Sequence, residues 1–290
     1  MRANPWHPRI SPFFTYIALM ALATAVRPWV PSLWPVLYAV QCGATVWLLW
    51  RYRALVPELN WSFHWLAVPT GVGLLVAWVG LGWLMAGEFS HRFNALLAGE
   101  TTGLLPYRSD PALEPGPFTT TDTSWMLELP VGVFSIALGL KLLGMTLVVP
   151  MFEELFVRST LLRGLHSARQ TGLGLMQWLI DSPLGEWLLH TRWGEHASKQ
   201  SGAFTRQLEQ NPVGALSVFA VTLSTVIFML SHAPRDWPGC IACGIVWCLL
   251  VWWTNRGDKK LGLGPVVWSH AITNALLWAY TLWSWDWQFL

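Results

Sequence analysis

Long apolar runs alternate with short polar segments along the 290 residues of this chain. A helix needs about 20 mostly apolar residues to cross the hydrocarbon core of a bilayer. Runs of this kind occupy residues 10–27, 31–50, 63–86, 130–150, 151–166, 213–231, 238–254 and 262–285. Because lipid satisfies no backbone hydrogen bonds, these runs must be helices. The pattern therefore predicts an all-α, polytopic transmembrane helical bundle with about seven or eight spans.

Two long stretches between these runs do not have the composition of a span. Residues 87–129 are rich in proline, threonine and acidic residues, and we predict an extramembrane loop there. Residues 167–212 contain a half-apolar stretch broken by acidic residues and a proline, which is typical of an interfacial or re-entrant insert. We therefore predict one integral membrane domain over residues 1–290. In it, residues 1–129 form N-terminal spans and the loop, and residues 130–290 form candidate catalytic helices with the insert.

The composition supports a membrane protein. Only 12% of the residues are charged and 53% are hydrophobic, whereas a soluble domain carries about 25% charged residues. A chain this poor in charge cannot cover a surface that faces water, so we expect membrane lipid around most of it. The net charge of +2 comes from short basic clusters without interleaved aromatic residues, which predicts no nucleic-acid partner.

The four cysteines lie in or at the edges of apolar runs. Cys240 and Cys243 form a single CxxC without a second pair. We interpret them as small apolar helix residues and predict no metal site from them.

The orientation in the membrane is ambiguous from the sequence. The positive-inside rule places the basic loop 51–60 in the cytoplasm. Counting onward with eight spans puts the basic residues at 256–260 outside, which the same rule disfavours. Either residues 130–166 form one broken, tilted element, or the segment 167–212 enters the membrane.

Three apolar segments carry polar side chains that need an explanation, because an ionisable group at membrane depth costs several kcal/mol. The first follows Pro150 directly. Glu154 and Arg158 are i,i+4 neighbours in the favourable order for an ion pair on a helix. Glu153 lies about 100° round the helix and is free to face a cavity. The alternative is an interfacial helix start beside the lipid headgroups.

The other two segments lie later in the chain. Phe228 precedes His232 by one helical turn, so its ring can pack beneath the imidazole. A satisfied interfacial histidine is the alternative there. His270 and Asn274 share one face of the run 262–285, and an interhelical hydrogen-bonded pair is an equally good interpretation. Taken together, the three segments predict helices that pack around one intramembrane polar cavity.

In this order and spacing, the motifs EExxxR at 153–158, FxxxH at 228–232 and HxxxN at 270–274 resemble those of the CPBP family. These proteins are the type II CAAX prenyl endopeptidases and their bacterial relatives. The resemblance covers residues of roughly 150–275. It implies an α-helical bundle with a cavity inside the membrane.

The resemblance also implies roles for the motif residues. Glu153 would be the general base that activates a water molecule, helped by His232. Glu154 would support this arrangement with Arg158, and Phe228 would support His232. Asn274, with His270, would donate to the oxyanion of the tetrahedral intermediate. All of these roles fit the needs of water attack on an amide.

The resulting prediction is an intramembrane endopeptidase, a glutamic-type peptidase located in the bacterial inner membrane. Its substrate would be a membrane-associated protein or peptide, and some relatives cleave C-terminal membrane anchors in protein sorting. We expect no cofactor, and favour a metal-free reaction over one in which a glutamate and two histidines bind zinc. The alternative from another class is a non-catalytic transporter or immunity-type binding protein that uses the same cavity.

Overall fold

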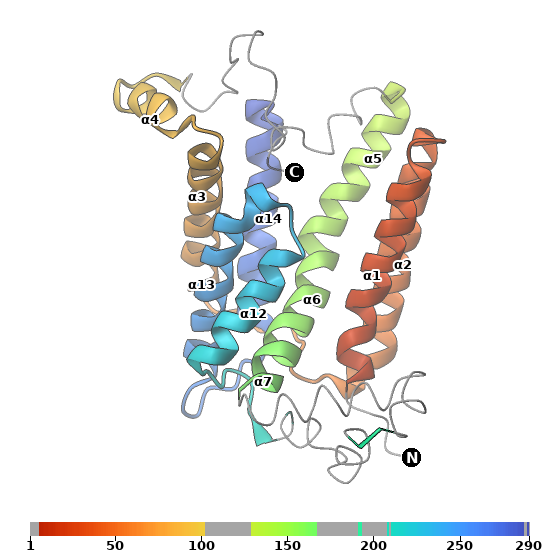
Figure 1. The fold of residues 1–290 in the computed structure, drawn as a ribbon, viewed down its shortest axis with the longest axis vertical. Coiled ribbons are helices and arrows are strands. Elements are labelled where there is room, and N and C mark those ends of the chain that lie inside the picture. The colour runs from red at the N-terminus through yellow and green to blue at the C-terminus, as the bar shows by residue number, and fades with distance from the viewer. Residues whose placement is uncertain are drawn as a thin grey trace.

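The structure is a computed structural model that describes residues 6–101, 129–166, 191–192, 208, 210–286 and 289. These residues form a bundle of helices without strands (Figure 1). The helices are α1 (His7–Val26), α2 (Trp34–Tyr52), α3 (Ala67–Met85), α4 (Phe89–Leu97), α5 (Val131–Leu143), α6 (Val149–Glu154), α7 (Leu162–Gly164), α12 (Val218–Leu230), α13 (Trp237–Asn255) and α14 (Gly264–Ser284). Short 3₁₀ turns are η1 (Pro31–Leu33), η2 (Arg53–Leu55) and η7 (Pro234–Asp236).

Among the described residues, five helical segments are long and apolar enough to cross a bilayer. They are His7–Val26, Pro31–Leu55, Ala67–Met85, Val131–Gly164 and Pro234–Asn255. Helix α12 is apolar but has only 13 residues, and α14 has 21 residues and packs against α3. The predicted all-helical membrane fold is therefore confirmed, and the chain is an integral membrane protein.

The predicted spans 130–150 and 151–166 are one element, so the count of eight separate spans was wrong and the alternative of a single element over 130–166 is confirmed. The segment Val131–Gly164 is continuous over 34 residues and contains two π-helical stretches, η5 (Gly144–Val148) and η6 (Leu155–Leu161). The proline at 150 suggested a boundary because it has no N–H to donate. The wider turn of η5 accommodates it instead, with the Val149 N–H donating to the Gly144 carbonyl.

Two other predicted segments are only partly described. The predicted loop 87–129 contains helix α4, and its residues 102–128 lie outside the described residues. Most of the predicted insert 167–212 also lies outside them.

Because Val131–Gly164 is one span and not two, the basic loops at 51–60 and 256–260 no longer fall on opposite sides of the membrane. With one span fewer, the α2–α3 connection, the end of α7 and the α13–α14 connection lie at the same end of the bundle (Figure 1). The Leu263 N–H donates to the Glu58 carbonyl at 2.8 Å, which joins two of these connections directly. The basic loop 51–60 and the basic residues at 256–260 therefore share one side of the membrane. The positive-inside rule predicts that this side is the cytoplasm.

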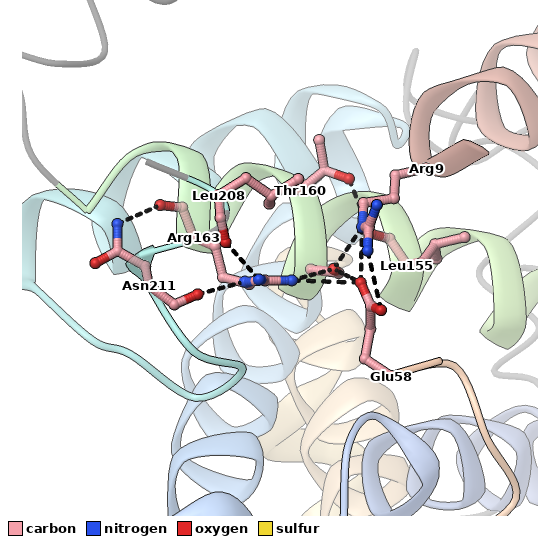
Figure 2. Close-up of polar contacts among 8 residues, drawn as sticks. Arg9, Glu58, Leu155, Thr160, Arg163, Leu208 and Asn211 are labelled. Carbon is pink, nitrogen blue, oxygen red and sulfur yellow. Dashed lines mark hydrogen bonds and ion pairs between the residues drawn. The ribbon is translucent and has the colours of Figure 1, made fainter. Parts of the chain in front are cut away.

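At this end, Glu58 holds several elements together (Figure 2). Arg9 donates from Nε and Nη2 to the two Glu58 carboxylate oxygens, at 2.7 and 3.0 Å. Ser159 Oγ and Arg163 Nη1 donate to Glu58 Oε1 at 2.5 and 3.3 Å. The start of α1, the α2–α3 connection and the segment η6–α7 thus meet on one buried carboxylate.

Small residues allow the helices to approach closely around α3 and α13. A Cβ atom at Gly71 would lie 2.8 Å from the Ser269 carbonyl oxygen and from Ile272 Cγ2. One at Gly239 would lie 2.7 Å from the Trp78 ring. Close backbone contact of this kind is the usual means of helix association in a bilayer. It fixes α14 against α3, and α14 carries the HxxxN motif.

The orientation is testable by labelling. Asp258→Cys, in the α13–α14 connection, is expected to react with a membrane-impermeant maleimide only after intact cells are permeabilised. Ala98→Cys, beyond α4 at the other end, is expected to react in intact cells. The four native cysteines are buried or half-buried, so background labelling is low. Labelling of Asp258→Cys in intact cells would contradict the assignment.

The Glu58 cluster predicts a pH-dependent stability. Burial alone would raise the pKa of Glu58, but the hydrogen bonds and charge of Arg9, with Ser159, outweigh it and hold the pKa below its usual value. The carboxylate therefore stabilises the fold above the usual glutamate pKa of about 4.3, and this contribution is lost as the pH falls through the lowered value. Glu58→Gln leaves two buried guanidinium groups poorly paired, with an expected cost of about 3–5 kcal/mol at neutral pH.

The measurement is thermal unfolding of the purified protein in detergent, followed by circular dichroism. The stability difference between the parent chain and Glu58→Gln should be constant above about pH 5 and should shrink below about pH 4. A difference that does not change with pH would show that the Glu58 charge is not what holds the cluster.

Candidate active site

The EExxxR motif lies where α6 passes into the π-helical stretch η6. Glu154 is fully buried, and its Oε2 lies 3.4 Å from Nε of the equally buried Arg158. The Arg158 guanidinium also lies over the rings of Phe228 and Trp247, at 5.4 and 5.6 Å from their centroids. The predicted i,i+4 ion pair is confirmed. Aromatic faces from α12 and α13 enclose its cation, which adds a favourable cation–π contribution.

His270 connects the two carboxylates. Its Nδ1 donates to Glu154 Oε1 at 2.9 Å, and its Nε2 lies 3.9 Å from Glu153 Oε2. The Trp247 indole stacks on the imidazole at a centroid distance of 4.2 Å and donates from Nε1 to Ser269 Oγ. The ring is thus fixed on both its edge and its face. A carboxylate can only accept a hydrogen bond, so Nδ1 carries a proton and Nε2 is directed at Glu153.

Asn274 lies one turn after His270 and is held by the π-helical stretch η5. Its Nδ2 donates to the Met145 carbonyl at 2.8 Å. In a π-helical turn this carbonyl would accept from the residue five positions later, but that residue is Pro150, which has no N–H. The proline therefore leaves a backbone acceptor for Asn274. One N–H and the carbonyl oxygen of the Asn274 side chain remain for other partners.

His232 lies in the connection between α12 and α13. Its Nδ1 donates to the Phe228 carbonyl at 2.9 Å, and the Phe228 ring packs against the imidazole with centroids 4.7 Å apart. The packing predicted for this motif is confirmed. Because a carbonyl only accepts, Nδ1 carries the proton, and Nε2 is left as an acceptor.

The short α12 explains the depth of this histidine. Thirteen residues of helix rise about 20 Å, whereas the 21 residues of α14 rise about 32 Å. The α12–α13 connection therefore lies part-way along the length of the bundle and not at its end (Figure 1). This places the polar connection at membrane depth, beside the other two motifs.

The motif residues meet at one cavity of about 150 Å³. Glu153, His232, His270 and Asn274 all line it, together with Phe228. Glu154 and Arg158 do not line it and lie behind Glu153 and His270. The cavity is large enough for several water molecules. The convergence expected from the three sequence motifs is therefore present in the structure, whereas the catalytic roles remain predictions.

Several lining residues could not be recognised from the sequence motifs. They are Trp78, Met145, Val149, Arg235, Asp236, Cys243, Trp247, Thr273, Leu277 and Phe289. Tryptophans are too frequent in this chain for Trp247 to stand out. Arg235 and Asp236 did carry a signal, because they are charged residues between two apolar helices, three and four positions after His232.

All four cysteines are free; Cys240, Cys243 and Cys248 are buried and Cys42 is half-buried. The carbonyl oxygen of Cys243 accepts a hydrogen bond from Arg158 at 3.4 Å. Among the described residues, no group of three His, Cys, Asp or Glu side chains is arranged to hold a metal ion.

Residues 135–276 match the family model described as "Type II CAAX prenyl endopeptidase Rce1-like". The matched range begins in α5, includes α12 and α13, and ends just beyond Asn274 in α14. All three motifs thus lie inside it. The comparison with curated proteins and the comparison with solved structures found no match.

Because Glu154 and Arg158 are buried together behind the cavity, we predict that removing one of the two charges lowers the stability of the protein much more than removing both. Arg158→Met leaves the buried Glu154 carboxylate without its cation and should destabilise the protein by about 3–5 kcal/mol. The double variant Glu154→Gln, Arg158→Met removes both charges and should recover most of this loss. Thermal unfolding of the two single variants and the double variant gives the coupling energy. Additive effects would show that the two charges are not coupled.

Proposed function

The chain belongs to the Type II CAAX prenyl endopeptidase Rce1-like family through residues 135–276, and on this premise we propose that it is a glutamic-type intramembrane endopeptidase. Membership supports a membrane peptidase that acts on a peptide substrate. The observation that carries the finer proposal is the single cavity lined by Glu153, His232, His270 and Asn274. Its substrate is a membrane-associated protein or peptide.

Glu153 is the candidate general base. It lines the cavity, with a side-chain exposure of 13%, whereas Glu154 is fully buried and engaged by Arg158 and His270. One carboxylate is therefore available to water and the other is held by its neighbours. In the proposed step, Glu153 takes a proton as the water oxygen forms a bond to the carbonyl carbon of the substrate. The peptide C–N bond then breaks, and the proton passes to the leaving amine.

Two further groups can assist this step. His232 Nε2 is an acceptor because Nδ1 donates to the Phe228 carbonyl, so it can help Glu153 to orient the attacking water. The remaining Asn274 N–H is a donor for the negative charge that develops on the carbonyl oxygen, with His270 beside it. Removal of one such donor typically costs about 10²–10³-fold in rate.

We derive no step through a metal ion, because the described residues contain no triad of ligands arranged for one. The zinc-dependent alternative has a direct test. Elemental analysis of the purified protein, together with the effect of a chelator on processing, separates the two mechanisms. Stoichiometric zinc that is lost together with activity would favour the metal enzyme.

The proposed location is a bacterial inner membrane, and the proposed substrates include proteins with a C-terminal membrane anchor. A cavity at membrane depth suits an apolar chain segment that reaches it from the bilayer. The matched family is described by the words CAAX prenyl endopeptidase.

The test compares the C-terminal peptides of membrane proteins, identified by mass spectrometry, in cells that contain the parent chain or a variant. Glu153→Gln should abolish the processed C-termini, because loss of a general base lowers the rate about 10²–10⁴-fold. Asp258→Asn, in the α13–α14 connection, is the matched control and should process normally.

Two outcomes would contradict the proposal. Unchanged processing by a correctly inserted Glu153→Gln variant would remove Glu153 from the chemistry. Function that survives this substitution but stops when the proton gradient is collapsed would favour the transporter alternative.

A further inference from the structure

Arg235 lines the same cavity from the connection between α12 and α13. It belongs to η7 and follows His232 by three residues. Because α12 is short, this connection lies part-way along the bundle, between the two ends that the longer helices reach (Figure 1). An arginine at such a depth is costly, rare and usually functional.

The residues around Arg235 pair with only part of its guanidinium group. Among the described residues its ion pair is with Asp236, where Nε lies 3.4 Å from Oδ1. Nε and Nη1 are buried and have no hydrogen-bond partner there. A guanidinium carries five N–H donors in a planar fork, and buried donors nearly always have a partner. Asp236 therefore compensates the charge, while the hydrogen-bonding capacity of Arg235 is largely unused.

We propose that Arg235 binds a carboxylate group of the substrate in the catalytic cavity. A carboxylate is the planar, bidentate complement of a guanidinium, and the pair is among the strongest hydrogen-bonded pairs in proteins. The phosphate of a lipid headgroup has similar chemistry but lies at the membrane surface, above the depth of this connection. The proposal rests on the endopeptidase function, because the ligand is part of the chain to be cut.

With this contact, the two ends of the cavity have different roles. Glu153 and His270 act at the bond to be broken, and Arg235 holds a charge at a fixed distance along the substrate. The distance between the bound carboxylate and the catalytic residues then determines which peptide bond is cut. Two sources can supply it: the free C-terminus of the substrate, or an aspartate or glutamate side chain.

The experiment measures binding of three dansyl-labelled apolar hexapeptides to purified protein in phosphatidylcholine vesicles. The first has a free C-terminal carboxylate, the second is its C-terminal amide, and the third is the amide with one internal glutamate. All binding is measured in the Glu153→Gln protein, so that no peptide is cut. Energy transfer from the tryptophans of the protein reports binding, and the part of it that is lost when Trp78 and Trp247, which line the cavity, are replaced by phenylalanine reports binding at the site.

The first peptide should bind about 10- to 100-fold more tightly than the second, as expected for hydrogen bonds to a charged group. Adding Arg235→Gln should remove this preference, and Arg235→Lys should retain part of it. Arg256→Gln is the matched control, because this exposed arginine packs on Trp252 and Trp253 away from the cavity. The double variant Arg235→Gln, Asp236→Asn avoids an unpaired aspartate and should behave like Arg235→Gln.

Equal binding of all three peptides, including no binding of any, would overturn the proposal. So would a preference that survives in both Arg235→Gln variants. Tight binding of the third peptide identifies an acidic side chain as the ligand, and weak binding identifies the C-terminus; either result supports a carboxylate site. Because no cleavage is measured, a failure here leaves the role of Glu153 intact, and unchanged processing by Glu153→Gln would leave this binding result intact.

Discussion

Charged groups inside this bundle have to be compensated by other groups of the protein, because the surrounding lipid supplies neither hydrogen bonds nor opposite charges. Glu154 shows how strict this constraint is. It is fully buried and is held by Arg158 from its own helical segment and by His270 from α14. Arg158 in turn lies against rings from α12 and α13. The charge of one carboxylate thus determines how three other helices approach the segment Val131–Gly164, and the cavity forms in front of this contact.

The same segment is anchored a second time, near its end. Ser159 and Arg163 contact Glu58, which also holds Arg9 at the start of α1 (Figure 2). Two charge clusters therefore act on one helical element, about one to two turns apart. The N-terminal helices carry none of the three motifs, but through this contact they help to fix the element that bears Glu153. The N-terminal part of the chain, which precedes the matched family range, therefore has a structural role.

Most of the helices could be predicted from the sequence because bilayer thickness sets their length and lipid sets their composition. The ion pair of Glu154 and Arg158 was predictable from helical spacing, and the meeting of the three motifs followed from the cost of leaving them in lipid. The sequence left open whether the chain divides at Pro150, because a proline usually marks a boundary while the distribution of basic residues favoured one continuous element. The role of the Met145 carbonyl and the depth of Arg235 also escaped prediction. Both depend on where helices end in space and on backbone groups, which side-chain patterns do not encode.

The two π-helical stretches carry a consequence for how this sequence can change. A π-turn holds one residue more than an α-turn, and each residue turns an α-helix by about 100°. The extra residue is absorbed within the turn, so the residues after it keep nearly the same direction as after an α-turn with one residue fewer. Deleting a single residue between Gly144 and Val148, with a return to α-helical geometry, would therefore leave Glu153 and Glu154 pointing as they do now. Deleting a residue from the α-helical turns of α5 would instead rotate everything after it by about a quarter turn, and Glu153 would leave the face that lines the cavity. A change of length in this segment is therefore compatible with the site only inside the π-turn.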